Sequence, residues 1–303
     1  MSPQPAPALP GWLASELPFS RFVLNVNGHA MHYIDAGEGP VVLLQHGNPT
    51  WCFLWRKVIA LLVKEQVRVI APDLIGLGLS DKPRDAHLHT LDWHASNLAS
   101  LVEQLDLNDI TLGAQDWGGP ISAVMASRVP ERIHGAVFAN TSIQPPPDPM
   151  RVTAFHQFAN RPIASTLAFK WLNFPLPVLH KVQGDPASIG KLEKRAYRYP
   201  LRHFKDRTAP LALARMVPID QQHPSVATLK ESQQWAQQFT GPVALVWGKR
   251  DPILGKALGR IRQLFPNAPV TETGAGHFLQ EEVPQALADA ILKVVNNNKT
   301  PAT

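Results

Sequence analysis

A short stretch of the sequence, AQDWG at 114–118, places a carboxylate where nucleophilic chemistry could begin. Asp116 has a small residue two positions before it and a glycine two positions after it. This spacing is the steric signature of a nucleophile elbow, a sharp strand-to-helix turn that exposes its central side chain above a sheet. The usual central residue is serine, and an aspartate before a helix is otherwise typical of an N-cap. We predict that Asp116 is a nucleophile presented by such a turn.

A second stretch, QHGNP at 45–49, follows the apolar run 40–45. In folds with a nucleophile elbow, the loop after this strand supplies one oxyanion-hole amide, and the residue after the nucleophile supplies the other. We therefore expect the backbone N–H groups of Asn48 and Trp117 to form an oxyanion hole. A plain Gly/Asn/Pro turn would also explain the composition of the loop.

Two further candidates each follow a predicted strand. Asp251 lies in WGKRDP and His277 in GAGHF. Alone, an aspartate before proline is typical of a turn, and one histidine among twelve is most often structural or exposed. Together with Asp116 they give the chain order nucleophile, acid, base, which is the order in this class of fold. We predict a triad of Asp116, Asp251 and His277.

These residues need strands and helices to position them, and the hydrophobic pattern supplies both. Strands are predicted at 21–26, 30–35, 40–45, 67–71, 110–115, 134–139, 243–247 and 270–273. Helices are predicted at 54–64, 92–105, 119–128, 225–238, 255–264 and 283–295. This alternation indicates an α/β fold with a mainly parallel sheet covered on both faces. The dipeptide Asn27-Gly28 predicts an opening hairpin, and the first thirteen, proline-rich residues predict an extended arm.

One long interruption divides the core. From 144 to 222 no buried-strand run occurs, and helical pieces at 151–160, 163–172 and 187–196 are separated by prolines. We interpret 1–143 and 223–303 as the core and 144–222 as a helical cap. Ligands of open α/β sheets bind at the carboxyl edge of the strands, so the cap is expected to roof the site.

Composition excludes several classes of protein. Of 303 residues, 45% are hydrophobic and 17% charged, which is too apolar for a disordered chain. The single cysteine, Cys52, excludes a disulfide framework and a cysteine-rich zinc site. The sequence predicts no membrane span and no secretory signal, so we expect a cytoplasmic protein without a membrane partner. We also expect no metal, no cofactor and no nucleic-acid partner. Residues 191–207 hold seven Lys/Arg against two acids, which predicts a solvated helix and loop or, alternatively, attraction of an acidic partner.

Six motifs point to one family: HGNPTWCFLWR (46–56), PDLIGLGLSDKP (72–83), GAQDWGGP (113–120), AYRYPL (196–201), VWGKRDP (246–252) and GAGHFLQEEVP (274–284). Over about residues 20–295 the chain resembles haloalkane dehalogenases of the α/β-hydrolase fold. One branch of that family carries its acid where Asp251 stands. Another uses a glutamate just after the preceding core strand, at the place of Asn140 here, so we assign the acid to Asp251.

The resemblance implies hydrolysis of haloalkanes to alcohol, halide and proton, through a covalent alkyl ester on Asp116. A saturated carbon needs in-line displacement by an anion, and a carboxylate is charged at neutral pH. His277 would then activate water and Asp251 would orient it. The side-chain N–H groups of Asn48 and Trp117 would bind the halide. Trp171 is a conceivable second donor, and four other residues could line the pocket: Phe155, Phe158, Phe169 and Leu172.

Other functions share parts of this pattern. An epoxide hydrolase would share the triad but needs two separated cap tyrosines, whereas Tyr197 and Tyr199 are close alternates and Tyr33 lies outside the cap. A serine esterase is disfavoured by the aspartate at the elbow. Fluoroacetate dehalogenases place arginine after the nucleophile, and coelenterazine-type luciferases carry the glutamate that is absent here. A non-catalytic binding protein on the same fold is a further alternative.

Overall fold

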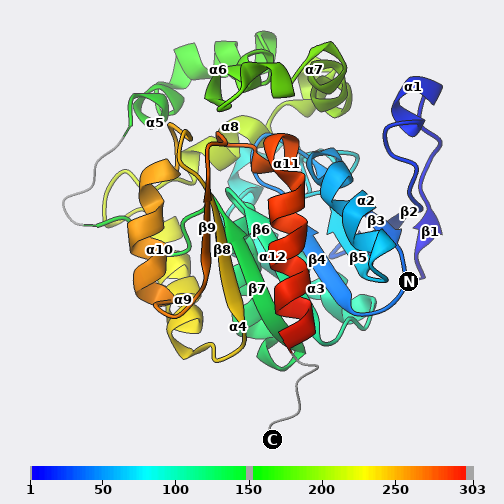
Figure 1. The fold of residues 1–303 in the computed structure, drawn as a ribbon. Helices are drawn as coiled ribbons and strands as arrows, with labels where there is room; N and C mark the ends of the chain where they lie inside the picture. The colour runs from blue at the N-terminus through cyan, green and yellow to red at the C-terminus, as the bar shows by residue number, and fades with distance from the viewer. Residues whose placement is uncertain (1, 148–152, 298–303) are drawn as a thin grey trace, which may run out of the picture.

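The computed structural model describes residues 2–147 and 153–297. In these residues a nine-stranded sheet has the order β1-β2-β3-β5-β4-β6-β7-β8-β9 (Figure 1). Its strands are β1 (Gln4–Pro5), β2 (Arg21–Val26), β3 (His29–Ala36), β4 (Val41–Gln45), β5 (Arg68–Pro72), β6 (Ile110–Gln115), β7 (Ile133–Ala139), β8 (Val243–Gly248) and β9 (Val270–Thr273). The pairs from β5 through β9 are parallel, and those from β1 to β3 and between β3 and β5 are antiparallel. The predicted mostly parallel α/β sheet is confirmed.

The central strands are apolar because both faces of the sheet are covered. All six residues of β6 are buried, as expected for a parallel strand between two helical layers. The predicted hairpin is also present, with Val26 paired to His29 across the turn. Asn27 and Gly28 have φ angles of 50° and 86°, the positive values that a two-residue type I′ turn requires.

Helices cover both faces of the sheet, as the alternation predicts. Helices α2 (Arg56–Lys64) and α12 (Pro284–Asn296) contact each other on the front face in Figure 1. On the other face, α4 (Gly118–Arg128) contacts both α3 (Leu91–Gln104) and α9 (Ser225–Gln238), and α10 (Leu258–Leu264) packs beside α9.

The extended arm predicted for the first thirteen residues is only partly correct. β1 adds an edge strand by pairing Gln4 with Val23, and a short helix, α1 (Gly11–Ala14), follows it. The side chain of Leu13 is fully buried in the main core, which explains why this proline-rich segment folds back on the sheet.

The segment predicted as a cap contains α5 (Ala154–Ala159), α6 (Pro162–Trp171), α7 (Lys191–Arg198) and α8 (Ala209–Arg215). These helices lie beyond the carboxyl ends of the parallel strands, at the top of Figure 1. The predicted helix at 163–172 corresponds to α6, and that at 151–160 to α5, although residues 151–152 lie outside the described part of the chain. The sequence did not predict α8 or the short helix α11 (Leu279–Glu282).

A buried ionic cluster ties α7 to the core. Glu281 accepts hydrogen bonds from the Arg56 guanidinium at 2.6 Å and from the Tyr197 hydroxyl at 2.6 Å. All three side chains are at least 95% buried. Because breaking a buried pair leaves an uncompensated charge, this cluster holds the position of α7 relative to α2 and α11.

No helix in the described ranges has both the length and the apolar character needed to cross a membrane.

Candidate active site

Asp116 stands at a strained turn between β6 and α4. Its φ of 53° is unusual for a residue with a side chain, and such outliers cluster at functional sites. The Thr141 hydroxyl donates a hydrogen bond to the Asp116 carbonyl at 2.6 Å, which secures the turn. A Cβ at Gly47 would overlap the Asp116 carboxylate, and one at Gly119 would overlap Thr141. Gly47, on the loop after β4, and Gly119, in α4, are therefore required by close approach to the elbow.

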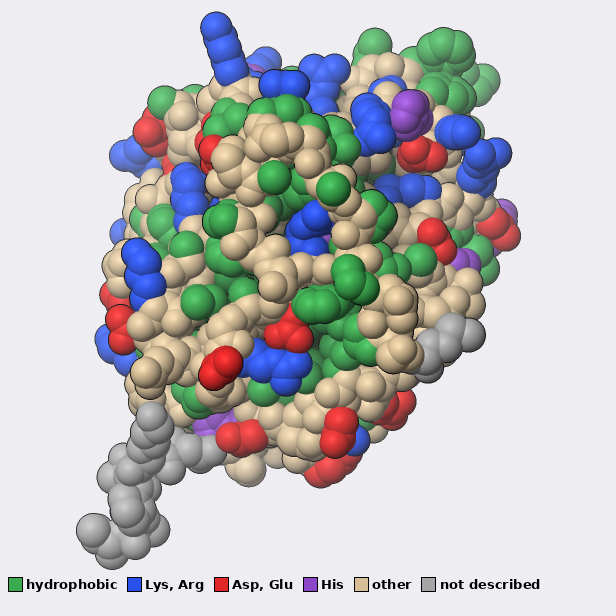
Figure 2. All heavy atoms as spheres, turned by 90° about the vertical axis from the view of Figure 1, so that its right-hand side faces the viewer, with side chains coloured by type: hydrophobic (Ala, Val, Ile, Leu, Met, Phe, Trp, Pro, Cys, Tyr) green, Lys and Arg blue, Asp and Glu red, His purple; other side chains and the backbone are tan. Residues whose placement is uncertain are grey.

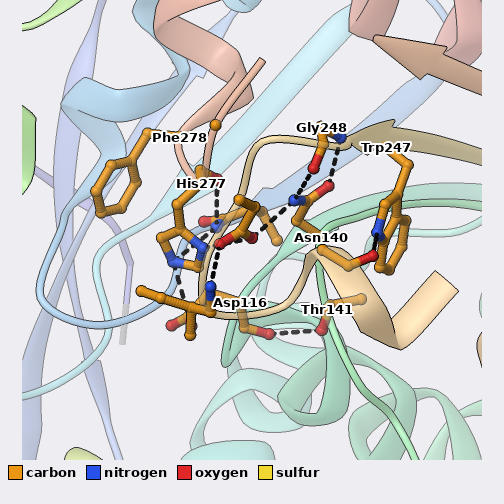
Figure 3. A network of polar contacts seen from close by, with 12 residues as sticks. Asp116, Asn140, Thr141, Trp247, Gly248, His277 and Phe278 are labelled. Carbon is orange, nitrogen blue, oxygen red and sulfur yellow. Dashed lines mark hydrogen bonds and ion pairs between the residues drawn. The ribbon is translucent and has the colours of Figure 1, made fainter. Parts of the chain in front are cut away.

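The structure brings together the three predicted triad side chains at the carboxyl ends of β6, β8 and β9. His277 Nδ1 lies 2.9 Å from Asp251 Oδ2, and His277 Nε2 lies 3.6 Å from Asp116 Oδ2. His277 and Asp251 are 1% and 5% exposed, so both are shielded from water. Figure 3 shows the imidazole of His277 above Asp116, with Asn140 and Gly248 to the right of both. A carboxylate, an imidazole and a second carboxylate thus form one chain of contacts.

The protonation of His277 depends on its two acidic neighbours. Burial alone would lower the pKa of the imidazole, but the charge of Asp251, the hydrogen bonds with Asp116 and Asp251, and the charge of Asp116 together raise that pKa to about 10. For Asp251, burial would raise the pKa of the carboxyl, but the His277 charge and hydrogen bonds from His277, Asn140 and the Ile253 amide lower it below its usual value. The raised pKa of His277 and the lowered pKa of Asp251 both favour an ion pair between His277 and its acidic neighbours.

Asn140 is a supporting residue whose contacts the sequence did not reveal. Its Nδ2 donates to Asp251 Oδ2 at 2.7 Å and to the Gly248 carbonyl at 3.0 Å, and its Oδ1 accepts from the Gly248 amide at 2.7 Å. One side chain after β7 therefore fixes both the acid and the end of β8. Sequence comparison of the two acid positions drew attention to Asn140, but gave no signal for this hydrogen bonding.

The histidine loop is held by the segment that connects α6 to α7. The His277 amide donates to the Val182 carbonyl at 2.8 Å. Gln183 accepts from the Phe278 amide at 2.9 Å and donates to the Phe278 carbonyl at 3.1 Å. From the core side, the Gln115 amide donates to the His277 carbonyl at 3.0 Å. Sequence analysis missed Val182, Gln183 and Gln115, because nothing local marks a contact with a loop so far along the chain.

One of the two predicted oxyanion-hole donors makes its contact in this structure. The Asn48 backbone N–H donates to Asp116 Oδ1 at 2.8 Å. Within residues 2–147 and 153–297, the backbone N–H of Trp117 has no such bond to the carboxylate. Oδ1 is thereby tethered, while Oδ2 faces His277.

The two predicted halide donors, the side chains of Asn48 and Trp117, differ in whether they already donate a hydrogen bond to the protein. The Asn48 side chain uses one N–H to donate to the Pro210 carbonyl at 2.9 Å. The amide nitrogen has a second hydrogen, which this bond leaves free. The indole of Trp117 has no protein acceptor among the described residues, and Trp117 lines the cavity beside Asp116. Both side chains therefore retain an N–H for a further acceptor.

A cavity of about 320 Å³ lies over the nucleophile. Asp116, Trp117, Asn48 and His277 lie on its wall near the sheet. The rest of the wall is mostly apolar, and the helical segment above the sheet contributes much of it: Phe155, Phe174, Pro175, Val178, Leu179, Val182, Ala214 and Val217. A mostly apolar cavity of this size suits a small apolar molecule.

Several predicted pocket residues lie elsewhere. Of the four proposed lining residues, Phe155 lines the cavity, whereas Phe158 and Phe169 pack behind it and Leu172 is 69% exposed. Trp171 is 68% exposed on the outer surface, which places its indole away from the cavity. Three of the four proposed lining residues, and Trp171, thus lie outside the cavity lining, because the helical period of α6 cannot by itself tell which face turns inward.

The three tyrosines do not reach the cavity. Tyr33 is buried in β3, and the Tyr197 hydroxyl is bound to Glu281. Tyr199 packs against Trp12 at a centroid distance of 5.9 Å. The cavity therefore offers no phenol pair to protonate an epoxide oxygen, as the sequence indicated.

One cluster of potential metal ligands occurs among the described residues, formed by His32, Cys52 and Asp73. The Asp73 carboxylate already accepts from His32 Nδ1 and from the backbone amides of Cys52 and Leu79, at 2.7–2.9 Å. None of these three residues lines the cavity over Asp116. The hydrogen bonds assign Asp73 to holding the loop after β5.

The chain is similar to known proteins along most of its length. A family model described as alpha/beta hydrolase fold matches residues 40–183. A cis-3-alkyl-4-alkyloxetan-2-one decarboxylase of Shewanella oneidensis is 30% identical, over 95% of this chain and 92% of that protein. A haloalkane dehalogenase of Mycolicibacterium paratuberculosis is 32% identical, over 86% of each.

The solved structures agree with the sequence relatives. The crystal structure of a haloalkane dehalogenase from Bradyrhizobium elkani aligns with a TM-score of 0.84 at 26% identity, covering 93% of this chain and 99% of that one. The shared fold, the matching length and the sequence identity lead to one assignment. The chain belongs to the haloalkane dehalogenase family of the α/β-hydrolase fold.

Proposed function

We propose that the protein is a haloalkane dehalogenase in which Asp116 is the nucleophile, His277 the base and Asp251 the acid that orients it. The observation that carries this proposal is the chain of contacts from Asp251 through His277 to Asp116, at the floor of an apolar cavity. A carboxylate of this kind suits saturated carbon, which cannot form a tetrahedral intermediate and reacts by in-line displacement.

In the first step, Asp116 Oδ2 attacks the carbon that carries the halogen. The carbon–oxygen bond forms as the carbon–halogen bond breaks, and the electron pair leaves with the halide. Asp116 Oδ1 is held by the Asn48 amide, so Oδ2 is the oxygen free to react. The indole N–H of Trp117 and the second side-chain N–H of Asn48 would solvate the departing halide, since both are donors that cannot act as bases.

In the second step, water hydrolyses the alkyl ester at the Asp116 carboxyl carbon. His277 Nε2 takes a proton from the water, and the adjacent Asp251 stabilises the imidazolium that results. The carboxyl oxygen Oδ1 becomes an oxyanion already in contact with the Asn48 amide. The alcohol leaves with a proton from His277, so the overall products are alcohol, halide and one proton.

Ester formation itself prepares His277 for this role. The charge of Asp116 and its hydrogen bond both raise the pKa of the imidazole in the free enzyme. The ester is neutral, so the pKa of His277 falls once the alkyl group is attached. The base thus becomes available at the step that needs it.

A second candidate function is suggested by the Shewanella relative, which is named as a decarboxylase of oxetan-2-ones. The same Asp116 oxygen could displace the ring oxygen from the saturated ring carbon that bears it, leaving a free carboxylate on the next carbon. Loss of carbon dioxide from that carboxylate would form an alkene and expel Asp116. This path uses the nucleophile but needs no hydrolytic water.

One experiment separates the two functions. The protein is incubated in parallel with 1-bromobutane, with 1,2-dibromoethane and with a short cis-3,4-dialkyl oxetan-2-one. Dehalogenase activity gives bromide and acid in equal amounts from the first two compounds, whereas decarboxylase activity gives carbon dioxide and alkene from the third. Asp116→Ala is the matched control and should abolish either reaction. Absence of bromide from both haloalkanes, with alkene from the lactone, would replace the first proposal by the second.

A further inference from the structure

The outer surface of α6 exposes a row of large apolar side chains. Ile163, Leu167 and Trp171 are spaced four residues apart, which places them on one face of the helix. They are 79%, 52% and 68% exposed. Leu172 and Phe204 continue the patch, and the Phe204 ring lies 4.8 Å from that of Trp171. We call these five residues the α6 stripe.

The inner face of the same helix is accounted for by packing. Phe169 is 1% exposed and lies 5.4 Å from the ring of Phe174 and 6.4 Å from that of Phe155. Phe155 and Phe174 line the cavity. The side chains on the outward face therefore take no part in packing the core. A contiguous exposed apolar patch of this kind marks an interaction surface. Phe169, on the inner face of α6, thus contacts two of the rings that line the cavity.

The charge of the molecule is concentrated around this surface. Residues 144–222 hold twelve Lys/Arg and five Asp/Glu, a net charge of +7, whereas the whole chain has +5. The remainder of the chain is therefore slightly acidic. Arg202 and Lys205 are exposed beside Phe204, and the Arg207 guanidinium donates to the Lys170 carbonyl at the end of α6. Figure 2 shows hydrophobic side chains projecting at the upper right of the molecule, with Lys and Arg side chains beside them.

We infer that the α6 stripe and its basic surroundings are a docking surface for an anionic lipid membrane. Apolar side chains that enter the headgroup boundary, flanked by Lys and Arg that attract anionic lipids, are the features of peripheral membrane helices. The charge complementarity favours an anionic surface, and α6 and α7 lie at the outermost end of the molecule in Figure 1, where a flat surface can reach them. This departs from the sequence-based expectation of no membrane partner, and it involves surface binding without a membrane-spanning helix.

Docking in this way would bring the cavity close to the bilayer. Apolar substrates partition into lipid, and the aromatic layer of Phe155, Phe169 and Phe174 would lie between the membrane and the nucleophile. The inference does not depend on which of the two reactions the cavity performs, because both substrates are apolar.

The test is sedimentation with vesicles of phosphatidylcholine alone and of equal parts phosphatidylcholine and phosphatidylglycerol. The stripe variant is Leu167→Gln/Trp171→Gln, and the charge variant is Arg202→Ala/Lys205→Ala. The matched control is Leu88→Gln, which alters an exposed leucine of a short helical turn (Ala86–Leu88) outside the segment 144–222. Circular dichroism confirms that each variant is folded, and turnover of whichever substrate the wild type accepts, a water-soluble bromoalkanol or the oxetan-2-one, confirms that it is active.

The wild type and the control should sediment with the anionic vesicles, less with the neutral ones, and progressively less as salt is raised. Each basic residue near an anionic surface changes partitioning by about fivefold, so the charge variant should lose at least tenfold. The stripe variant should also lose at least tenfold.

Three results would overturn the inference. One is a failure of the wild type to sediment with either vesicle. Another is equal sedimentation of the stripe variant and the control. A third is a wild-type dimer in gel filtration that the stripe variant converts to monomer, since a second copy of the chain would then cover the stripe.

Discussion

Replacement of Asp251 by asparagine should separate the two chemical steps. Asp251 Oδ2 faces His277 Nδ1 at 2.9 Å and Asn140 Nδ2 at 2.7 Å, while Oδ1 accepts from the Ile253 amide at 2.7 Å. All three partners are donors when His277 carries its proton on Nδ1. An asparagine supplies one acceptor oxygen and one donor nitrogen, so in either orientation its amide nitrogen faces a donor.

The magnitude follows from charge and tautomer. Loss of the Asp251 charge lowers the pKa of His277 and leaves at most a neutral acceptor to fix the proton on Nδ1. In serine hydrolases the same substitution of the orienting acid slows catalysis about 10⁴-fold, or about 5 kcal/mol of transition-state stabilisation. Displacement of halide uses Asp116 and the halide donors, so most of the loss should fall on ester hydrolysis. The alkyl ester should therefore accumulate in Asp251→Asn.

The assay is rapid quench with 1-bromobutane, followed by bromide measurement and intact-protein mass spectrometry. Asp251→Asn should release one equivalent of bromide in a fast burst and then turn over very slowly, with one butyl group added to the protein. Asp289→Asn, an exposed aspartate of α12, is the matched control and should behave as the wild type. A slow steady state without accumulated ester would show that Asp251 acts before the ester forms, which would refute the reasoning.

Three further changes test other parts of the account. Trp117→Phe keeps the ring but removes the indole N–H, and because a hydrogen bond to a charged group contributes about 1.5–3 kcal/mol, the inhibition constant for product bromide should rise at least tenfold. Gly47→Ala would push a methyl group into the Asp116 carboxylate, so halide release should fall at least 100-fold in a variant that circular dichroism shows to be folded. Burial would raise the pKa of the Asp73 carboxyl. The charge of His32, the hydrogen bond from His32, the charge of His46 and the hydrogen bond from the Leu79 amide together lower that pKa to about 2. A pKa that is lowered in the folded state contributes stability that is complete above the ordinary value near 4 and is lost as pH falls toward 2. The free energy of unfolding by urea should therefore fall by about 2 kcal/mol between pH 4 and pH 2. Asp73→Asn should not show this loss.

The parallel core was predictable because buried strands leave a local signal. The strands β4 to β8 are short, mostly apolar runs, and the ends of all strands from β4 to β9 lie within one residue of the predicted ones. The elbow at Asp116 was predictable from the fixed spacing of its small neighbours, although the atoms that require Gly118 and Gly119 belong to the distant residues Gln45 and Thr141.

What the sequence could not show are contacts made between distant segments. The clamp of Gln183 on Phe278 joins residues 95 positions apart, and the bond of Asn140 to Asp251 joins residues 111 apart. Neither has a local pattern. The orientation of α6 was also hidden, because Trp171 and Phe169 are both aromatic residues of the same helix and only the packing beneath them decides which is buried.

The most direct test of the central claim is a search for the covalent intermediate in His277→Phe. This variant retains Asp116, Asn48 and Trp117 but lacks the base for ester hydrolysis. Treated with 1-bromobutane, it should release one equivalent of bromide and gain one butyl group, which peptide mapping should place on Asp116; the double variant Asp116→Ala/His277→Phe should do neither. A folded His277→Phe protein that forms no adduct, while the wild type turns over the same substrate, would contradict attack by Asp116 on saturated carbon.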